Sequence, residues 1–93
     1  MTANIEPPER VAIVGAGVIG AAWAARWLLR GVDVAVSDPS SDAPRVVARV
    51  LDNARNAWER MGTAPEREGK LDFCDSIGTA VLGADVIQES VPE

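Results

Sequence analysis

The sequence predicts an α/β domain built on a doubly wound parallel sheet. Short apolar runs alternate along the chain with helical segments, and a glycine-rich hexapeptide follows the first run. The composition is globular, with 47% hydrophobic and 25% charged residues, and 93 residues allow one domain. We assign residues 1–9, rich in proline and glutamate, to a solvated lead-in and residues 10–93 to the domain.

The first strand and helix precede Gly31. Residues 11–14 form a continuous apolar run that ends at Gly15, which is typical of a strand covered on both faces. Periodicity alone does not separate such a run from the start of a buried helix, and the glycines that follow favour the strand. Residues 18–30 have a helical composition and are apolar around most of the circumference, so we expect this helix to be buried on most sides. Gly31 ends it.

The second strand and helix follow directly. Residues 32–37 alternate β-branched and polar side chains, as in a strand. Residues 40–42 offer N-cap oxygens, and apolar residues then recur at helical spacing as far as Met61. Gly62 closes this amphipathic helix.

The last third of the chain contains shorter elements. A polar connection leads to a short strand over 71–74, a helix of about two turns over 76–82 and a final strand over 86–91. Alternation of this kind produces a parallel sheet with right-handed crossovers. We expect the strand order 3-2-1-4.

Charge and composition exclude several function classes. The chain has 14 acidic and 9 basic residues, a net charge of −5, and no histidine. The acidic balance argues against nucleic-acid binding, and the commonest general base and metal ligand is missing, so we predict neither a metal nor a catalytic residue. Cys74 has no disulfide partner and is interpreted as a small buried hydrophobe. Residues 1–10 lack signal-peptide features, and 11–29 contain three glycines and an arginine. We therefore expect a cytoplasmic chain without membrane association.

The strongest functional signal is a hexapeptide with the spacing GxGxxG. Its residues are Gly15, Ala16, Gly17, Val18, Ile19 and Gly20. It follows a predicted strand and opens a predicted helix, the context in which this motif binds a dinucleotide. The first glycine allows a tight turn, the second lets the backbone approach a pyrophosphate, and the third lets the helix pack closely. Free N–H groups at the helix start then point at the anion.

An acidic residue completes the pattern. Asp38 ends the second strand, 23 residues after Gly15, and is expected to accept hydrogen bonds from both ribose hydroxyls of the adenosine half. A 2′-phosphate would meet this like charge, and the first arginine after it, Arg45, lies inside the next helix. NAD is therefore favoured over NADP. The alternative is a purely structural glycine turn.

Other conspicuous residues have ordinary structural interpretations. Trp23, Trp27 and Trp58 lie at helical spacing, and we interpret them as core residues rather than stacking platforms. Glu89 and Glu93 flank the carboxyl end of the last strand, where open parallel sheets bind ligands. Their alternative role is that of surface acids.

Three segments together resemble one enzyme family. They are VAIVGAGVIGAAWAARWLLRGVDVAVSDP, NAWERMG and ADVIQESVPE. Over residues 10–93 the chain resembles the N-terminal NAD-binding domain of the L-3-hydroxyacyl-CoA dehydrogenase family, and within it the carnitine 3-dehydrogenase branch. The resemblance implies a Rossmann-type fold, pyrophosphate binding by residues 15–20 and ribose binding by Asp38. It also implies that Glu93 lies near the nicotinamide ribose.

The resemblance further implies where the chemistry occurs. In this family a histidine and a glutamate later in the chain are catalytic, and a C-terminal helical domain completes the substrate site and forms the dimer. We expect this chain to bind NAD without oxidising a 3-hydroxy substrate. Lys70 is its only lysine, which disfavours coenzyme A and favours a small substrate. One alternative is a free-standing dinucleotide-binding or sensor module. Another is an FAD-binding half, and the sequence of residues 84–93 argues against this second alternative.

The last predicted strand forms a sheet edge. If the sheet ends there, Val86, Ile87 and Val91 lack a further strand to cover them. Exposed edges of this type associate with partners. We expect a homo-oligomer formed through this edge or its apolar face.

Overall fold

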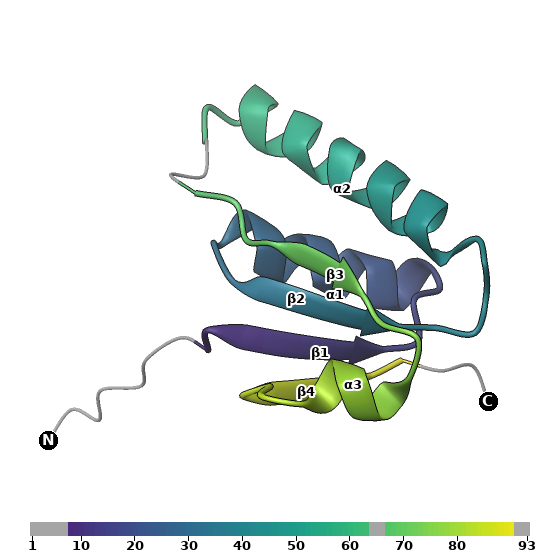
Figure 1. Cartoon of the computed structure of the whole chain (residues 1–93). Helices are drawn as coiled ribbons and strands as arrows, with labels where there is room; N and C mark the ends of the chain where they lie inside the picture. The colour runs from purple at the N-terminus through teal and green to yellow at the C-terminus, as the bar shows by residue number, and fades with distance from the viewer. Residues whose placement is uncertain (1–7, 64–66, 91–93) are drawn as a thin grey trace, which may run out of the picture.

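A computed structural model describes residues 8–63 and 67–90 and confirms the predicted alternation (Figure 1). Val91, Glu93 and most of the expected lead-in lie outside the described residues. The elements in chain order are β1 (Arg10–Val14), α1 (Val18–Leu29), β2 (Asp33–Ser37), α2 (Ala43–Arg60), β3 (Leu71–Phe73), α3 (Ile77–Val81) and β4 (Val86–Glu89). No helix in the described ranges is long and apolar enough to cross a membrane.

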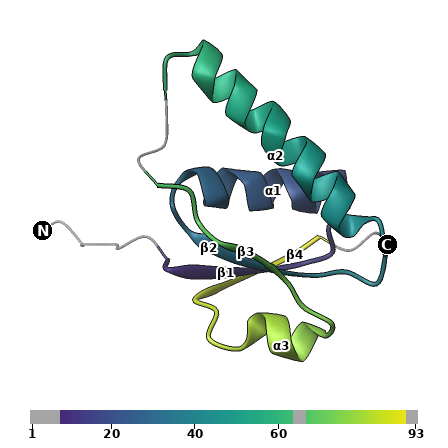
Figure 2. The ribbon, with the colours of Figure 1, turned by 45° about the horizontal axis from the view of Figure 1, so that its top comes forward.

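The sheet is parallel throughout, with the expected order β3-β2-β1-β4. Helices α1 and α2 cover one face and α3 covers the other (Figure 2). The chain moves outward from β1 to β3 and then returns to the far side of β1, so right-handed crossovers place α3 opposite the first two helices. The strands that follow β1 are added first on one side of it (β2 and β3) and then on the other (β4). This change of direction creates a switch point at the carboxyl ends of β1 and β4.

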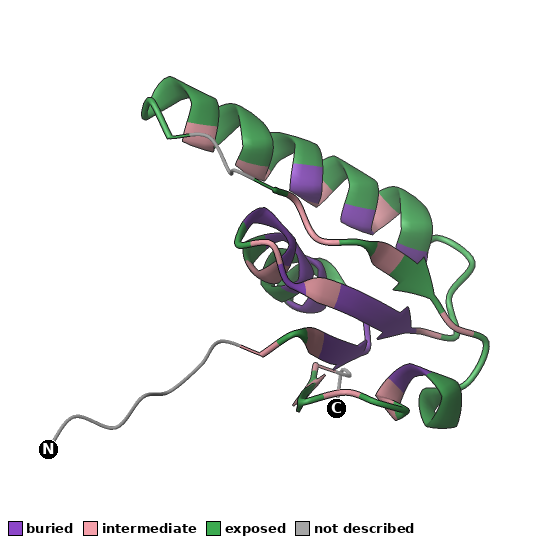
Figure 3. Ribbon diagram, turned by 60° about the vertical axis from the view of Figure 1, so that its left-hand side comes forward, coloured by how far each residue is buried: buried purple, intermediate pink, exposed green. Residues whose placement is uncertain are grey.

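The core lies between the sheet and the pair α1 and α2. Figure 3 shows buried residues along β1, β2 and the inner side of α1. Val11 and Ile13 of β1 face this core, whereas Ala12, between them, is also fully buried. Burial on both faces explains why the strand is continuously apolar instead of alternating. The largest fully buried side chains are Ile13, Leu28, Leu29, Val11, Val34, Val36 and Val47.

Helix α1 is buried on one side only, which contradicts the expectation that most of it is covered. Ile19 is 70% exposed and Trp23 37% exposed. The guanidinium of Arg26 lies 5.4 Å from the centre of the Trp23 ring. Trp27 and Trp58 are partly buried at the edge of the core. The interpretation of Trp23 as a core residue is therefore wrong, because a helix packed on a sheet presents only part of its circumference to that sheet.

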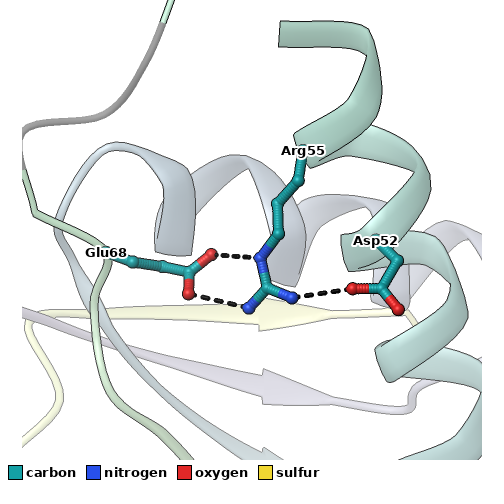
Figure 4. A network of polar contacts seen from close by, with 3 residues as sticks. All are labelled: Asp52, Arg55 and Glu68. Carbon is teal, nitrogen blue, oxygen red and sulfur yellow. Dashed lines mark hydrogen bonds and ion pairs between the residues drawn. The ribbon is translucent and has the colours of Figure 1, made fainter. Parts of the chain in front are cut away.

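An ion-pair network joins α2 to the segment that leads into β3 (Figure 4). Arg55 donates through Nε and Nη2 to the two carboxylate oxygens of Glu68, at 2.8 and 2.7 Å, and through Nη1 to Asp52 at 2.7 Å. The hydrogen bonds from Arg55 lower the pKa of the Glu68 carboxyl below its usual value. In the sequence, Arg55 is indistinguishable from the other arginines of the solvated face of α2.

Candidate dinucleotide-binding site

The glycine-rich loop connects the carboxyl end of β1 to the start of α1. Gly15 has φ +91°, a conformation that side chains other than glycine rarely adopt, and its N–H donates to Ser37 O at 2.9 Å. The loop is thereby held against the end of β2. Gly17 is the N-cap of α1 in an extended conformation, and no side chain caps the helix.

The start of α1 presents unused hydrogen-bond donors. The first backbone bond of the helix runs from Ala21 N to Gly17 O at 2.8 Å. The N–H groups of residues 17–20 precede this bond, and in the described part of the chain they donate to no acceptor. Together with the helix dipole, these donors make the start of α1 a candidate anion-binding site at the end of the first strand.

The last two glycines of the motif have different surroundings. A Cβ added to Gly17 would have no atom within 4 Å, so the space above this residue is open. A Cβ added to Gly20 would lie well under 3.0 Å from Gly15 O and 3.4 Å from Ser90 Cβ. Gly17 therefore leaves room for a ligand, whereas Gly20 is required by the packing of α1 on the loop itself and on the end of β4.

Asp38 links the two loops that border the site. Its Oδ2 accepts from Ala16 N at 2.5 Å and its Oδ1 accepts from Ser40 N at 2.7 Å. A carboxylate has about four lone-pair positions, so these two bonds leave capacity for ribose hydroxyls. The N–H of Ala16 donates to Asp38 and is therefore not free to bind a ligand. Ala16 contributes to the site by positioning Asp38.

An open cleft of about 330 Å³ lies beside Asp38. It is bordered by the β2–α2 loop and the carboxyl end of β3. Its lining residues are Val36, Asp38, Pro39, Ser40, Ser41, Ala43, Pro44, Phe73, Cys74 and Asp75. Cys74 is half-buried at this cleft, which contradicts the expectation of a buried hydrophobe. The mixture of apolar surface and polar groups suits a nucleoside.

The structure does not place Glu89 or Glu93 at the cleft, and it shows a turn at Ser40 that was not predicted from the sequence. Glu93 lies outside the described residues, and Glu89 is exposed on β4 opposite Val14. The bond from Ser40 N to Asp38 forms an Asx-type turn, which the order Asp-Pro-Ser could have indicated. Among the described residues no three His, Cys, Asp or Glu side chains form a possible metal site.

This fold and loop define a dinucleotide-binding domain, and comparison with known proteins identifies its family. The model of the 3-hydroxyacyl-CoA dehydrogenase NAD-binding domain matches residues 10–93. The chain belongs to this family, as the sequence resemblance predicted, and its cofactor is NAD.

Curated relatives place the chain within the family more closely. It is 52% identical over 85 residues to an L-carnitine dehydrogenase/betainyl-CoA thioesterase of Rhizobium sp., a match that covers 90% of this chain and 17% of the relative. It is 51% identical over 87 residues to an L-carnitine dehydrogenase of Mesorhizobium japonicum, covering 91% of this chain and 24% of the relative. The chain thus spans a quarter or less of these two relatives.

Solved structures agree with the fold. One is 5-formyl-3-hydroxy-2-methylpyridine 4-carboxylic acid 5-dehydrogenase, an NAD⁺-dependent dismutase, with a TM-score of 0.75 and 34% identity. That match covers 91% of this chain and 28% of the other. A second is M. tuberculosis FadB2, with a TM-score of 0.74 and 25% identity over 95% of this chain and 32% of the other.

Proposed function

We propose that this chain is the NAD-binding part of an L-carnitine-type 3-hydroxy-acid dehydrogenase. The observation that carries the proposal is the identity of about one half to L-carnitine dehydrogenases over nine tenths of the chain. The whole enzyme transfers a hydride between the 3-position of a small 3-hydroxy substrate and NAD, which supplies the hydride acceptor. The substrate-binding and catalytic groups are proposed to belong to the part of such enzymes that has no counterpart in these 93 residues.

The residues of the loop and of the β2–α2 connection suit the two parts of the adenosine diphosphate. The N–H groups of Gly17, Val18, Ile19 and Gly20 bind the pyrophosphate at the start of α1. The Asp38 carboxylate accepts from the ribose hydroxyls while it holds Ala16 N. We also propose that Glu93 lies near the nicotinamide ribose.

Preference for NAD over NADP follows from the charge of the cleft. Asp38 and Asp75 line it, and none of its lining residues is an arginine or a lysine. A 2′-phosphate on the adenosine ribose would therefore meet carboxylates without a compensating cation. Arg45, the first arginine after Asp38, pairs with Asp42 at 3.4 Å.

Calorimetric titration of the chain with NAD and NADP tests this site. The unsubstituted chain is expected to bind NAD more tightly than NADP. Asp38→Ala should weaken NAD binding about tenfold by removing the ribose acceptor, and should narrow the difference between NAD and NADP by removing the like charge. Unchanged NAD affinity in Asp38→Ala, or tighter binding of NADP by the unsubstituted chain, would contradict the assignment.

The absence of histidine from the chain supports a prediction about activity. The 93 residues alone are expected to bind NAD and to produce no NADH from L-carnitine. Turnover measured as absorbance of NADH would overturn this division of roles.

A cytoplasmic location is part of the proposal, because the free thiol of Cys74 is typical of a reducing compartment.

Self-association is proposed through β4. Val86 is 38% exposed and Ile87 57% exposed on this strand, which pairs with β1 alone among the described strands. An unpaired edge with exposed apolar side chains favours association with a second copy. Sedimentation of the chain should show dimers or larger species that Ile87→Lys reduces. A monomer at high concentration would contradict the proposal.

A further inference from the structure

Two tryptophans and two arginines form a surface on the side of α1 that the core does not use. They line a hollow of about 240 Å³, and all four belong to α1 or to its C-cap: Trp23, Arg26, Trp27 and Arg30. Trp23 and both arginines are exposed, and Trp27 is half-buried. The Arg26 guanidinium lies 5.4 Å from the centre of the Trp23 ring, a cation–π contact. We call these four residues the Trp–Arg surface.

Helical spacing shows on which side of α1 this surface lies. Gly20 borders the end of β4, since a Cβ added to it would lie 3.4 Å from Ser90 Cβ. Residues three and seven positions further along a helix share the same side, so Trp23 and Trp27 lie on the β4 side of α1. Helix α2 connects β2 to β3, on the other side of β1, and packs against the opposite side of α1. The elements that the structure describes therefore leave the Trp–Arg surface open to solvent.

The two arginines of this surface lack a carboxylate partner. Neither Arg26 nor Arg30 forms an ion pair with a residue in the described ranges, whereas other arginines of the chain do. The two cations are one turn apart on the same helix, where like charges repel each other. The helix dipole accounts for basic residues in the last turn, but it does not account for the tryptophans beside them. The combination of rings and unpaired cations indicates a binding surface.

Trp27 adds an unused hydrogen-bond donor to the same surface. Its Nε1 is inaccessible to water and has no acceptor among the described residues, although buried N–H groups nearly always have one. A carboxylate seated in the hollow can supply the acceptor after a small rotation of the ring. Tryptophan and arginine are also the residue types most enriched among those that dominate the binding energy of protein interfaces. Both observations favour a protein partner that carries carboxylates.

We propose that the Trp–Arg surface docks an acidic helix of a partner protein, with two carboxylates one turn apart. These carboxylates pair with Arg26 and Arg30, which are separated by about 6 Å along α1, and an apolar side chain between them packs on the Trp23 ring. Nucleic acid fits less well, because two arginines on a chain of net charge −5 neutralise few phosphates. The surface lies apart from the glycine-rich loop, so the inference does not depend on the proposed cofactor site.

Fluorescence anisotropy with a labelled synthetic helix tests this surface. The probe peptide carries glutamates one turn apart with leucines beside them, and the control peptide has glutamine in place of each glutamate. The chain should bind the glutamate peptide with a Kd in the micromolar range and the glutamine peptide at least about tenfold more weakly. Trp23→Ala should weaken the glutamate peptide about tenfold, because it removes the exposed ring on which the apolar side chain packs.

Two double substitutions provide a matched comparison. Arg26→Gln/Arg30→Gln and Arg49→Gln/Arg60→Gln remove the same amount of positive charge, and Arg49 and Arg60 are exposed on α2. The first should weaken the glutamate peptide at least about tenfold, whereas the second should change its affinity by less than about twofold. Both should bind NAD as the unsubstituted chain does, because none of the four arginines lies in the glycine-rich loop or lines the cleft beside Asp38.

The other outcomes would overturn the proposal. Equal weakening by the two double substitutions would mean that the peptide responds to net charge alone. Equal affinity for the glutamine peptide would exclude an acidic partner, and so would absence of binding of the glutamate peptide to the unsubstituted chain. Tighter binding of a labelled oligodeoxythymidine that Arg26→Gln/Arg30→Gln abolishes would assign the surface to nucleic acid. Conversion of a self-associated chain to a monomer by Trp23→Ala, measured by sedimentation, would assign it to a second copy.

Discussion

Substituting the second and the third glycine of the motif, one at a time, separates cofactor binding from folding. Gly17 and Gly20 both become alanine, a change of one methyl group each. At Gly17 the methyl enters open space, and φ is −70°, which alanine adopts readily. At Gly20 it falls on Gly15 O, a backbone atom that cannot move without displacing the loop.

The two magnitudes follow from these contacts. For Gly20→Ala, overpacking against a backbone oxygen costs about 1–3 kcal/mol, which lowers the Tm of a domain of this size by about 10 °C. For Gly17→Ala, alanine is a poorer N-cap than glycine by about 0.5 kcal/mol, and the restriction of the unfolded chain offsets this by about the same amount. The Tm of Gly17→Ala should therefore stay within about 3 °C of the parent.

Gly17→Ala should lose NAD affinity although its stability is nearly unchanged. The methyl group occupies the space through which the pyrophosphate reaches the N–H groups at the start of α1, so Gly17→Ala should weaken NAD at least about tenfold. Circular dichroism melting curves and calorimetric NAD titrations of both variants measure the two effects. Normal NAD affinity in Gly17→Ala would refute the assignment of the loop. A loss of Tm as large as that of Gly20→Ala would refute the packing argument.

Three further substitutions test two packing contacts and one ion pair. Gly69→Ala should lower the free energy of unfolding by about 1–3 kcal/mol, because its Cβ would lie well under 3.0 Å from Val32 O; chemical denaturation measures this. Gly78→Ala, whose Cβ meets no atom closer than 4.0 Å in α3, should instead raise it by about 0.5 kcal/mol. Glu68→Gln tests the bond to Arg55: the lowered pKa of Glu68 means that the pair stabilises the fold above pH about 4.5 and that this is lost as the pH falls below it. Between pH 7 and pH 3 the variant should therefore lose less stability than the parent. The difference should be under about 1 kcal/mol, because the pair is half-exposed. An identical pH dependence of the two proteins would contradict a stabilising role for this ion pair.

Local patterns in the sequence were sufficient for the fold, and they indicated where an anion site is expected. The run at 11–14, the glycines after it and the helical composition that follows are contiguous in the chain, and each favours the same structure. The strand order followed from the alternation of elements, since right-handed crossovers leave few topologies. Asp38 could be expected near the loop because parallel strands end at the same edge of the sheet.

Tertiary contacts decided what these patterns left open. Trp23 has the spacing of a core residue, yet only the packed sheet shows that its side of α1 faces outward. The bond from Ala16 N to Asp38, and the position of Ser90 beneath Gly20, join segments that are far apart in the chain. Helical and strand periodicity describes neighbours within one element, and it carries no information on which atoms of two elements meet. The order of the elements and the type of ligand are therefore legible in the sequence, whereas the hydrogen-bond partners in the site depend on how the strands and loops pack.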